Sequence, residues 1–192
     1  THSRKQMTDT ILNYLTNSSA ITYIVLALLS TYLIITIWIF LYRYFALKAL
    51  IRNEEKSLES LTSREATFSP LSALNKCANS TNSKELLYAC EINIIKEASS
   101  GISWLAIISS TSPFIGLFGT VVGILESFAK FSTHSKVAFS VIAPAISEAL
   151  VATAAGIFVA IFAYTFHQIL VRKVYELNTY IKAQSQILIA KG

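Results

Sequence analysis

Three stretches of the chain are almost free of charge, and each is long enough to cross a membrane as a helix. They are Ile21 to Tyr42, Ala98 to Leu125, and Val137 to Phe166, which is interrupted only by Glu148. A bilayer core of roughly 30 Å needs about 20 apolar residues, because a helix rises about 1.5 Å per residue. Aromatic residues of the kind that gather at membrane surfaces end the first stretch: Trp38, Tyr42 and Tyr44. The pattern therefore predicts three transmembrane helices.

Shorter patterns predict helices outside the membrane. Ala46–Leu61 continues the first span as a helix, and Phe68–Pro70 ends it. Lys84–Glu97 forms a second helix. The charged residues of both helices are expected to face water. An apolar seam follows the third span: Leu170, Val174, Leu177 and Ile181. In residues Met7–Asn17, Ile11, Leu12 and Leu15 share one face, which indicates a short amphipathic helix at the membrane surface.

The expected fold is an all-α membrane protein with three transmembrane helices. The second and third are long and extend into the cytoplasm, and a short amphipathic N-terminal helix and a helical cytoplasmic loop complete the chain. The predicted segments are an N-terminal periplasmic or interfacial segment, 1–19; transmembrane helix 1, 20–44; the cytoplasmic helical loop, 45–97; transmembrane helix 2, 98–129; a periplasmic turn, 130–136; transmembrane helix 3, 137–167; and a cytoplasmic helical tail, 168–192.

The positive charges predict the orientation in a bacterial inner membrane. The region Arg43–Glu97 holds eight Lys or Arg residues and the tail after His167 holds four, whereas the opposite side holds only Arg4, Lys5, Lys130 and Lys136. Cytoplasmic loops carry the excess of Lys and Arg. We therefore expect the long loop and the C-terminus in the cytoplasm, and the N-terminus and the short turn in the periplasm.

Composition narrows the function. The chain is 53% hydrophobic and only 14% charged, which is too apolar for an ordinary soluble domain. A net charge of +5 does not indicate nucleic-acid binding, because the cations follow the membrane segments. The two cysteines, Cys77 and Cys90, lack a zinc-like spacing and are expected as free thiols. No Ser/His or paired-Asp constellation lies at membrane depth, and there is no zinc-like ligand spacing, so we expect no enzyme, no cofactor and no metal.

Small residues form a stripe on the second span. At 100° per residue, seven residues fall within about 120° of one another: Ser109, Ser112, Pro113, Gly116, Gly119, Thr120 and Gly123. Bulky residues occupy the other face: Ile108, Ile115, Leu117, Phe118, Val121 and Leu125. Membrane helices associate through close backbone approach and interhelical hydrogen bonds, which such a stripe permits. Pro113 also removes one backbone donor from the helix.

The third span repeats this pattern after Pro144. Its small residues recur at helical spacing: Ala145, Ala149, Ala152, Gly156, Ala160 and Ala163. Glu148 and Thr153 flank the stripe. Glu148 lies on the order of 18 Å inside the outer turn, a depth at which a carboxylate must face protein or water. Glu148 is therefore either a functional acid or a neutral residue that tightens packing, and Glu126, near the end of the second span, is expected as a solvated charge.

Two sequence matches resemble one protein family. Ser112–Gly123, S-P-F-I-G-L-F-G-T-V-V-G, is similar to the second transmembrane helix of the MotA/TolQ/ExbB proton channel family. Ile142–Ile161 resembles the third helix of TolQ and ExbB. The Ser residues before Pro113 favour TolQ over ExbB. The chain departs from the family at Phe162, where Pro is usual, and at Val122, where Trp is frequent. MotA is less similar, because it has an additional transmembrane helix and a larger cytoplasmic domain.

The resemblance implies a function in proton transport. Its members form rings of five subunits around a single-span partner of the TolR or ExbD type, whose aspartate accepts the proton, and they pass energy to the outer membrane through a TolA- or TonB-like protein. Thr120 and Thr153 match the pore-facing threonines of the family and Glu148 its third-helix glutamate. A non-conducting structural scaffold of the membrane is the alternative, and a small transporter or intramembrane enzyme is a second one.

Overall fold

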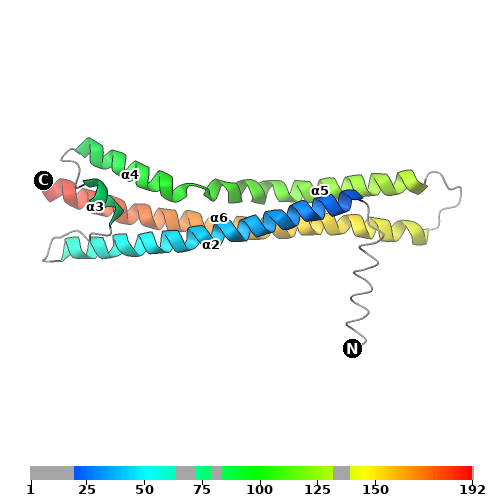
Figure 1. Ribbon diagram of the computed structural model, residues 1–192, viewed down its shortest axis with the longest axis horizontal. Coiled ribbons are helices and arrows are strands. Elements are labelled where there is room, and N and C mark those ends of the chain that lie inside the picture. The colour runs from blue at the N-terminus through cyan, green and yellow to red at the C-terminus, as the bar shows by residue number, and fades with distance from the viewer. Residues whose placement is uncertain (1–19, 64–71, 79–83, 132–138, 192) are drawn as a thin grey trace, which may run out of the picture. The chain divides into compact units, whose positions relative to one another are not determined.

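The computed structural model describes residues 20–63, 72–78, 84–131 and 139–191, and within them every regular element is a helix. The helices are α2 (Ala20–Thr62), α3 (Ala73–Ala78), α4 (Lys84–Ser99), α5 (Ile102–Phe131) and α6 (Phe139–Lys191) (Figure 1). Three of these are long and apolar enough to cross a membrane, over Ile21–Thr62, Ile102–Ala129 and Ile146–Ala190. The prediction of an all-α protein with three membrane helices is confirmed. The predicted N-terminal amphipathic helix lies outside the described residues.

The region between the first two spans is helical, as expected. The predicted helix Ala46–Leu61 is the continuation of α2, and the predicted helix Lys84–Glu97 is α4. Phe68–Pro70, the predicted break, lies outside the described residues. The six-residue helix α3 was not predicted, because a segment so short shows no apolar period. Gly101, with a φ of 79°, separates α4 from α5 and adopts a left-handed conformation that favours glycine.

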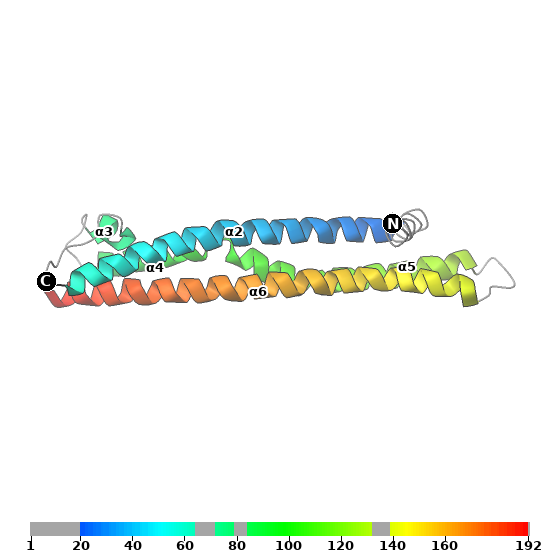
Figure 2. The same ribbon diagram turned by 90° about the horizontal axis from the view of Figure 1, so that it is seen from below.

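The helices pack into two compact units, which we describe separately. Unit 1 comprises Thr1–Thr36 and Ile107–Ala163, and unit 2 comprises Ile37–Ala106 and Tyr164–Gly192. In unit 1, the parts of α2, α5 and α6 lie side by side (Figures 1 and 2). Their shared apolar core is formed by Val25, Leu29, Ile108, Ala152, Val159 and Ala163. An apolar groove of about 410 Å³ lies between α2 and α6, lined by residues such as Leu26, Leu33 and Phe158.

Unit 2 contains α3, α4 and the remaining parts of α2, α5 and α6. The seam predicted on α6 forms its centre, since Leu170, Leu177 and Ile181 are completely buried. They pack with residues of the other helices: Leu47, Ile51, Leu74, Leu87, Ala98, Ile102 and Leu105. The rings of Phe40 and Phe166 stack with centroids 4.0 Å apart, which joins α2 to α6. The prediction of an apolar seam on this part of α6 is confirmed.

A buried carboxylate ties α3 to two other helices in unit 2. Glu54, on α2, is fully buried and accepts hydrogen bonds from the Ser72 hydroxyl at 2.8 Å and the Ala73 N–H at 2.6 Å. Gln184, on α6, donates to both the side chain and the carbonyl of Glu54 at 3.0 Å. Ser72 also caps α3 by accepting from the Asn75 N–H. The prediction that the loop charges form a solvated face is therefore wrong for Glu54, and it is also wrong for Glu91 on α4, which is buried.

The cysteine prediction also needs a correction. Cys90, on α4, is buried and disulfide-bonded, so the expectation of free thiols is wrong for this residue.

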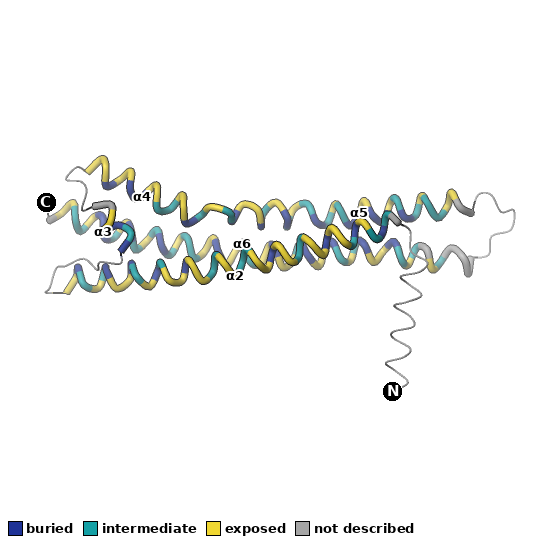
Figure 3. Tube along the Cα trace, in the orientation of Figure 1, coloured by how far each residue is buried: buried dark blue, intermediate teal, exposed yellow. Residues whose placement is uncertain are grey.

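Bulky apolar side chains cover the outer faces of the long helices. Exposed positions alternate with buried ones along each helix (Figure 3). The exposed residues include Ile34 and Trp38 on α2, Phe114 and Leu125 on α5, and Ile161 on α6. An apolar surface of this extent is typical of proteins in contact with lipid or with further subunits.

Candidate functional site

The backbones of α5 and α6 touch in unit 1 at a pair of glycines. A Cβ atom added to Gly116 would lie 2.6 Å from the Ala152 carbonyl oxygen and 3.2 Å from the Gly156 Cα. A Cβ added to Gly156 would lie 2.5 Å from the Ser112 carbonyl oxygen. Both obstacles are backbone atoms, which cannot rotate away. Any larger residue at either position would therefore separate the two helices.

The other two glycines of α5 face both neighbouring helices. A Cβ on Gly119 would meet the Val25 side chain at 3.0 Å and the Ala152 Cβ at 3.1 Å. A Cβ on Gly123 would lie 3.3 Å from the Ala149 Cβ and 3.7 Å from the Thr22 hydroxyl. The contact loosens along the helix from Gly116 to Gly123. The small face of α5 thus packs against α2 as well as α6, a role for α2 that the sequence did not indicate.

Beside this glycine contact, Thr120 and Thr153 meet across the two helices. Their hydroxyl oxygens are 2.5 Å apart, and either can be the donor. The Thr120 hydroxyl also lies 2.8 Å from the Ala149 carbonyl oxygen, and the Thr153 hydroxyl 3.3 Å from the Gly116 carbonyl oxygen. Two residues chosen from separate stripes of the sequence are therefore direct partners in the fold.

The single hydrogen on each hydroxyl limits how this pair can be hydrogen-bonded. Each hydroxyl has one hydrogen to donate and two lone pairs. In the arrangement that uses the shortest distances, Thr153 donates to Thr120, and Thr120 donates to the Ala149 carbonyl oxygen. The lone pairs of Thr153 then remain available to an incoming donor. In the reverse arrangement Thr120 donates to Thr153, and Thr153 donates to the more distant Gly116 carbonyl oxygen.

The two threonines differ in exposure. Thr120 is only 7% exposed, whereas Thr153 is half-buried and reaches the surface of unit 1. Thr153 is consequently the member of the pair that a second molecule can approach. The buried Thr120 fixes the position of the Thr153 hydroxyl through their hydrogen bond.

Glu148 lies on α6, five residues before Thr153 and therefore about 7.5 Å away along the helix axis. It is half-buried. Its neighbour Ala149 is buried and supplies the carbonyl oxygen that Thr120 bonds. Thr153 lies directly in the α5 contact, whereas Glu148 lies on the other flank of the small-residue stripe, next to Ala149.

The remaining predicted packing residues occupy different environments. Ala149, Ala152 and Gly156 are buried, Ala160 and Pro113 are half-buried, and Pro144 is exposed. In place of Ala160, Val159 completes the buried face of α6. The side chain of Ala145 lies outside the described residues.

Sequence reasoning misplaced two residues, Ile108 and Glu126, whereas Ser112 lies on the small-residue face as predicted. Ile108, predicted on the outer face of α5, is 5% exposed and belongs to the core of unit 1. Glu126, predicted to be solvated, is half-buried with one carboxylate oxygen fully covered. Ser112 is fully buried, donates to the Ile108 carbonyl oxygen at 2.6 Å and places its own carbonyl against Gly156. Within the described residues, no group of His, Cys, Asp and Glu side chains could hold a metal ion.

Comparison with known proteins gives matches along most of the chain. The family model described as the MotA/TolQ/ExbB proton channel family matches residues 62–183. The Helicobacter pylori (strain ATCC 700392 / 26695) protein named biopolymer transport protein ExbB-like 1 is 45% identical over 188 residues, which cover 96% of this chain and 100% of that protein.

More distant matches cover shorter segments. Biopolymer transport protein ExbB of Pseudomonas putida is 40% identical over 95 residues, 49% of this chain and 29% of that protein. The Tol-Pal system protein TolQ of Pseudomonas aeruginosa is 50% identical over 60 residues, 31% of this chain and 26% of that protein.

Proposed function

Because the chain belongs to the MotA/TolQ/ExbB proton channel family, we propose that it is a ring-forming inner-membrane subunit of a motor driven by the proton motive force. In this proposal, five copies surround the transmembrane helices of a TolR- or ExbD-like partner. The assembly passes energy to the outer membrane through a TolA- or TonB-like protein. One proton crossing the membrane supplies about 2.3 kcal/mol per 100 mV, which sets the scale of the work.

The observation that carries the proposal is the hydroxyl pair of Thr120 and Thr153. Thr153 reaches the surface of unit 1, while its hydroxyl stays bonded to Thr120. A protonated carboxylic acid on the partner would donate a hydrogen bond to the free lone pairs of Thr153. After the proton leaves, the carboxylate can only accept, so the Thr153 hydroxyl must turn and donate to it. The pair can therefore follow the protonation state of the partner's acid.

Glu148 has a supporting role in this proposal. Glu148 is a half-buried acid that lies about 7.5 Å from Thr153 along the axis of α6 and on the other flank of the small-residue stripe, so it adds a second polar group to this part of the helix. Glu148→Ala is expected to weaken either assembly or coupling.

The membrane orientation belongs to the same proposal. The cytoplasmic side holds the α2 extension, α3, α4 and the end of α6, as the distribution of Lys and Arg predicts. The part of the unit 2 core around Leu177 and Ile181 then belongs to the cytoplasmic part of each subunit.

Reconstitution tests the proposal. The chain is placed in liposomes with and without a single-span partner that carries a transmembrane aspartate, and a pH-sensitive dye records proton uptake under an imposed gradient. Uptake is expected only when both proteins are present, and replacing the partner's aspartate with asparagine should abolish it. An assembled complex that never takes up protons would favour the scaffold alternative.

A further inference from the structure

Two apolar stretches of the sequence end at the same level in unit 2. Arg43 is the first charged residue after the uncharged run Ile21–Tyr42, and Glu97 is the last one before the uncharged run Ala98–Leu125. The Arg43 guanidinium donates a hydrogen bond to the Glu97 carbonyl oxygen at 3.4 Å. The contact marks one rim of the membrane on both α2 and α4–α5.

The stacked rings of Phe40 and Phe166 place a third helix at this rim. Phe166 ends the uncharged part of α6, and His167 and Arg172 follow it. Three membrane segments therefore change from apolar to charged at one height. This agreement does not depend on which face of the membrane the rim occupies.

Arg43 is held in a specific seat at the junction of α4 and α5. A Cβ atom added to Gly101 would lie 3.4 Å from the Arg43 Nη2 and 3.5 Å from its Nε, so glycine leaves room for the guanidinium. The guanidinium also lies 5.9 Å from the centre of the Tyr42 ring. In the part of the chain that the structure describes, its hydrogen bond to Glu97 uses one of five N–H donors.

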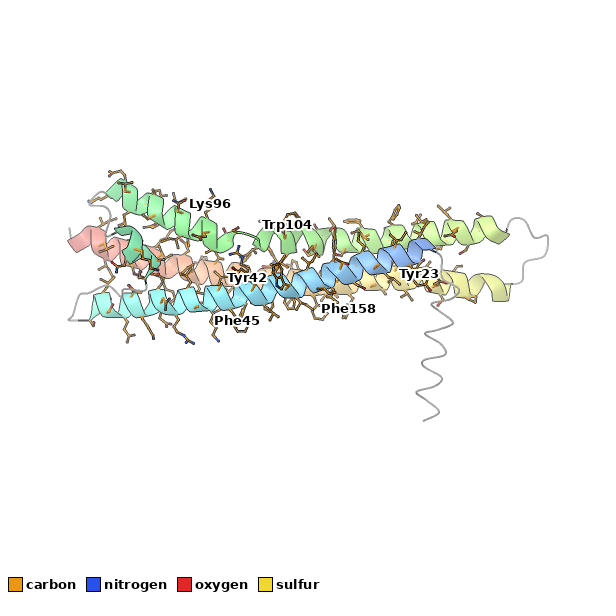
Figure 4. All side chains as sticks on the ribbon, in the orientation of Figure 1. Tyr23, Tyr42, Phe45, Lys96, Trp104 and Phe158 are labelled. Atoms are coloured by element: carbon orange, nitrogen blue, oxygen red, sulfur yellow. The ribbon has the colours of Figure 1, made fainter. Side chains whose placement is uncertain are left out.

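Two exposed aromatic residues and a second cation lie near this seat along the three helices. Tyr42 on α2, Lys96 on α4 and Trp104 at the start of α5 lie around the junction (Figure 4). Tyr42 is 66% and Trp104 61% exposed, and Lys96 is exposed as well. Trp38 stacks on Tyr42 with ring centroids 6.4 Å apart. The exposed Glu97 side chain is the acid at this position, and Arg43 and Lys96 outnumber it.

We propose that this surface, formed by Arg43, Lys96, Tyr42 and Trp104, binds the phosphate of an anionic phospholipid. A guanidinium fork matches the oxygens of a phosphate group, and basic pockets between transmembrane helices bind anionic headgroups. Trp and Tyr side chains prefer the headgroup level, where their rings contact acyl chains and their polar atoms contact water. An acidic protein segment would have to enter the headgroup layer between these rings, so the lipid is the better match.

Native mass spectrometry of the purified full-length chain tests this site. The chain is titrated with phosphatidylglycerol and, in parallel, with phosphatidylcholine. The unchanged protein should bind phosphatidylglycerol more tightly. Arg43→Gln keeps a donor for the Glu97 carbonyl but loses the charge, and should reduce that preference about fivefold, the value expected for one basic residue at a membrane surface. Lys182→Gln, which removes an exposed lysine from the far part of α6, should leave the preference unchanged.

Further arms keep the test decisive. Circular dichroism in phosphatidylcholine should show equal helicity for all variants. If Arg43→Gln fails to fold, Lys96→Gln replaces it and should likewise lower the preference for phosphatidylglycerol. Millimolar inorganic phosphate should not displace the lipid, since the acyl chains contribute to binding. Equal binding of phosphatidylglycerol and phosphatidylcholine would overturn the proposal, and so would equal effects of Arg43→Gln and Lys182→Gln. The proposal would also fail if an added acidic peptide displaced phosphatidylglycerol and abolished the preference for this lipid.

Discussion

Replacing Gly156 with alanine should separate α5 from α6, although it adds only one methyl group. The new Cβ would lie 2.5 Å from the Ser112 carbonyl oxygen, whereas ordinary contact begins at 3.4 Å. The shortfall of about 0.9 Å cannot be relieved by a side-chain rotation, because the obstacle is backbone. The helices must move apart by a similar distance.

The expected loss of stability is the sum of two costs and one gain. Overpacking costs about 1–3 kcal/mol. A helix shift of about 0.9 Å would also stretch the 2.8 Å hydrogen bond from Thr120 to the Ala149 carbonyl oxygen beyond bonding range, which costs about 1 kcal/mol more. Alanine returns about 1 kcal/mol through its higher helix propensity. The net loss of stability should be about 2 kcal/mol.

Gly123→Ala is the matched control. It makes the same chemical change inside a helix, but its Cβ would meet the Ala149 Cβ at 3.3 Å, so a shift of about 0.1 Å suffices. The assay is unfolding by sodium dodecyl sulfate in mixed micelles, followed by circular dichroism. Gly156→Ala should unfold at a distinctly lower detergent fraction than the wild type, and Gly123→Ala at the same or a higher one. Equal midpoints for the two variants would refute the close contact of α5 and α6.

Three further predictions concern the core of unit 2, the attachment of α3 and the role of Glu148. Leu177→Ala should destabilise unit 2 by about 2–5 kcal/mol, since its side chain is completely buried, and an unchanged midpoint would contradict that burial. Glu54→Ala should free the α3 segment, measured as faster amide hydrogen exchange at Ala73, because that N–H loses its acceptor; unaltered exchange would show that the carboxylate does not hold α3. Glu148→Gln should assemble normally yet lower partner-dependent proton uptake, while full uptake would leave Glu148 a packing residue.

Sequence alone predicts the membrane helices well, for a clear physical reason. A helix of about 20 residues without charge exposes apolar side chains on all sides, which is favourable in lipid and unfavourable in water. Ile21–Tyr42 and Ala98–Leu125 can therefore be recognised without any knowledge of partners. The apolar seam around Leu177 is equally visible, because its period is local. Helix faces were less certain. Ile108 lies at the edge of the apolar face of α5, and its burial in a core shared with α2 and α6 depends on how the three helices pack.

The candidate site is harder to predict than the helices. The sequence pattern places Thr120 within one small-residue stripe and Thr153 beside the other, but their meeting depends on the register of α5 against α6. That register is set by the contact of Gly116 with Gly156, two residues separated by many positions in the chain. Glu54 escaped prediction for a similar reason, since its donors Ser72 and Gln184 lie far away in the sequence.

Proton uptake by two variants of one residue tests the central claim most directly. Thr153→Ser keeps the hydroxyl and Thr153→Val keeps the shape, so the pair isolates the hydrogen bond from the packing. In liposomes that contain the assembled complex with its aspartate-bearing partner, the serine variant should take up protons at close to the wild-type rate, and the valine variant should take up none. Equal uptake by both variants would contradict a role for the Thr120–Thr153 pair in proton transfer.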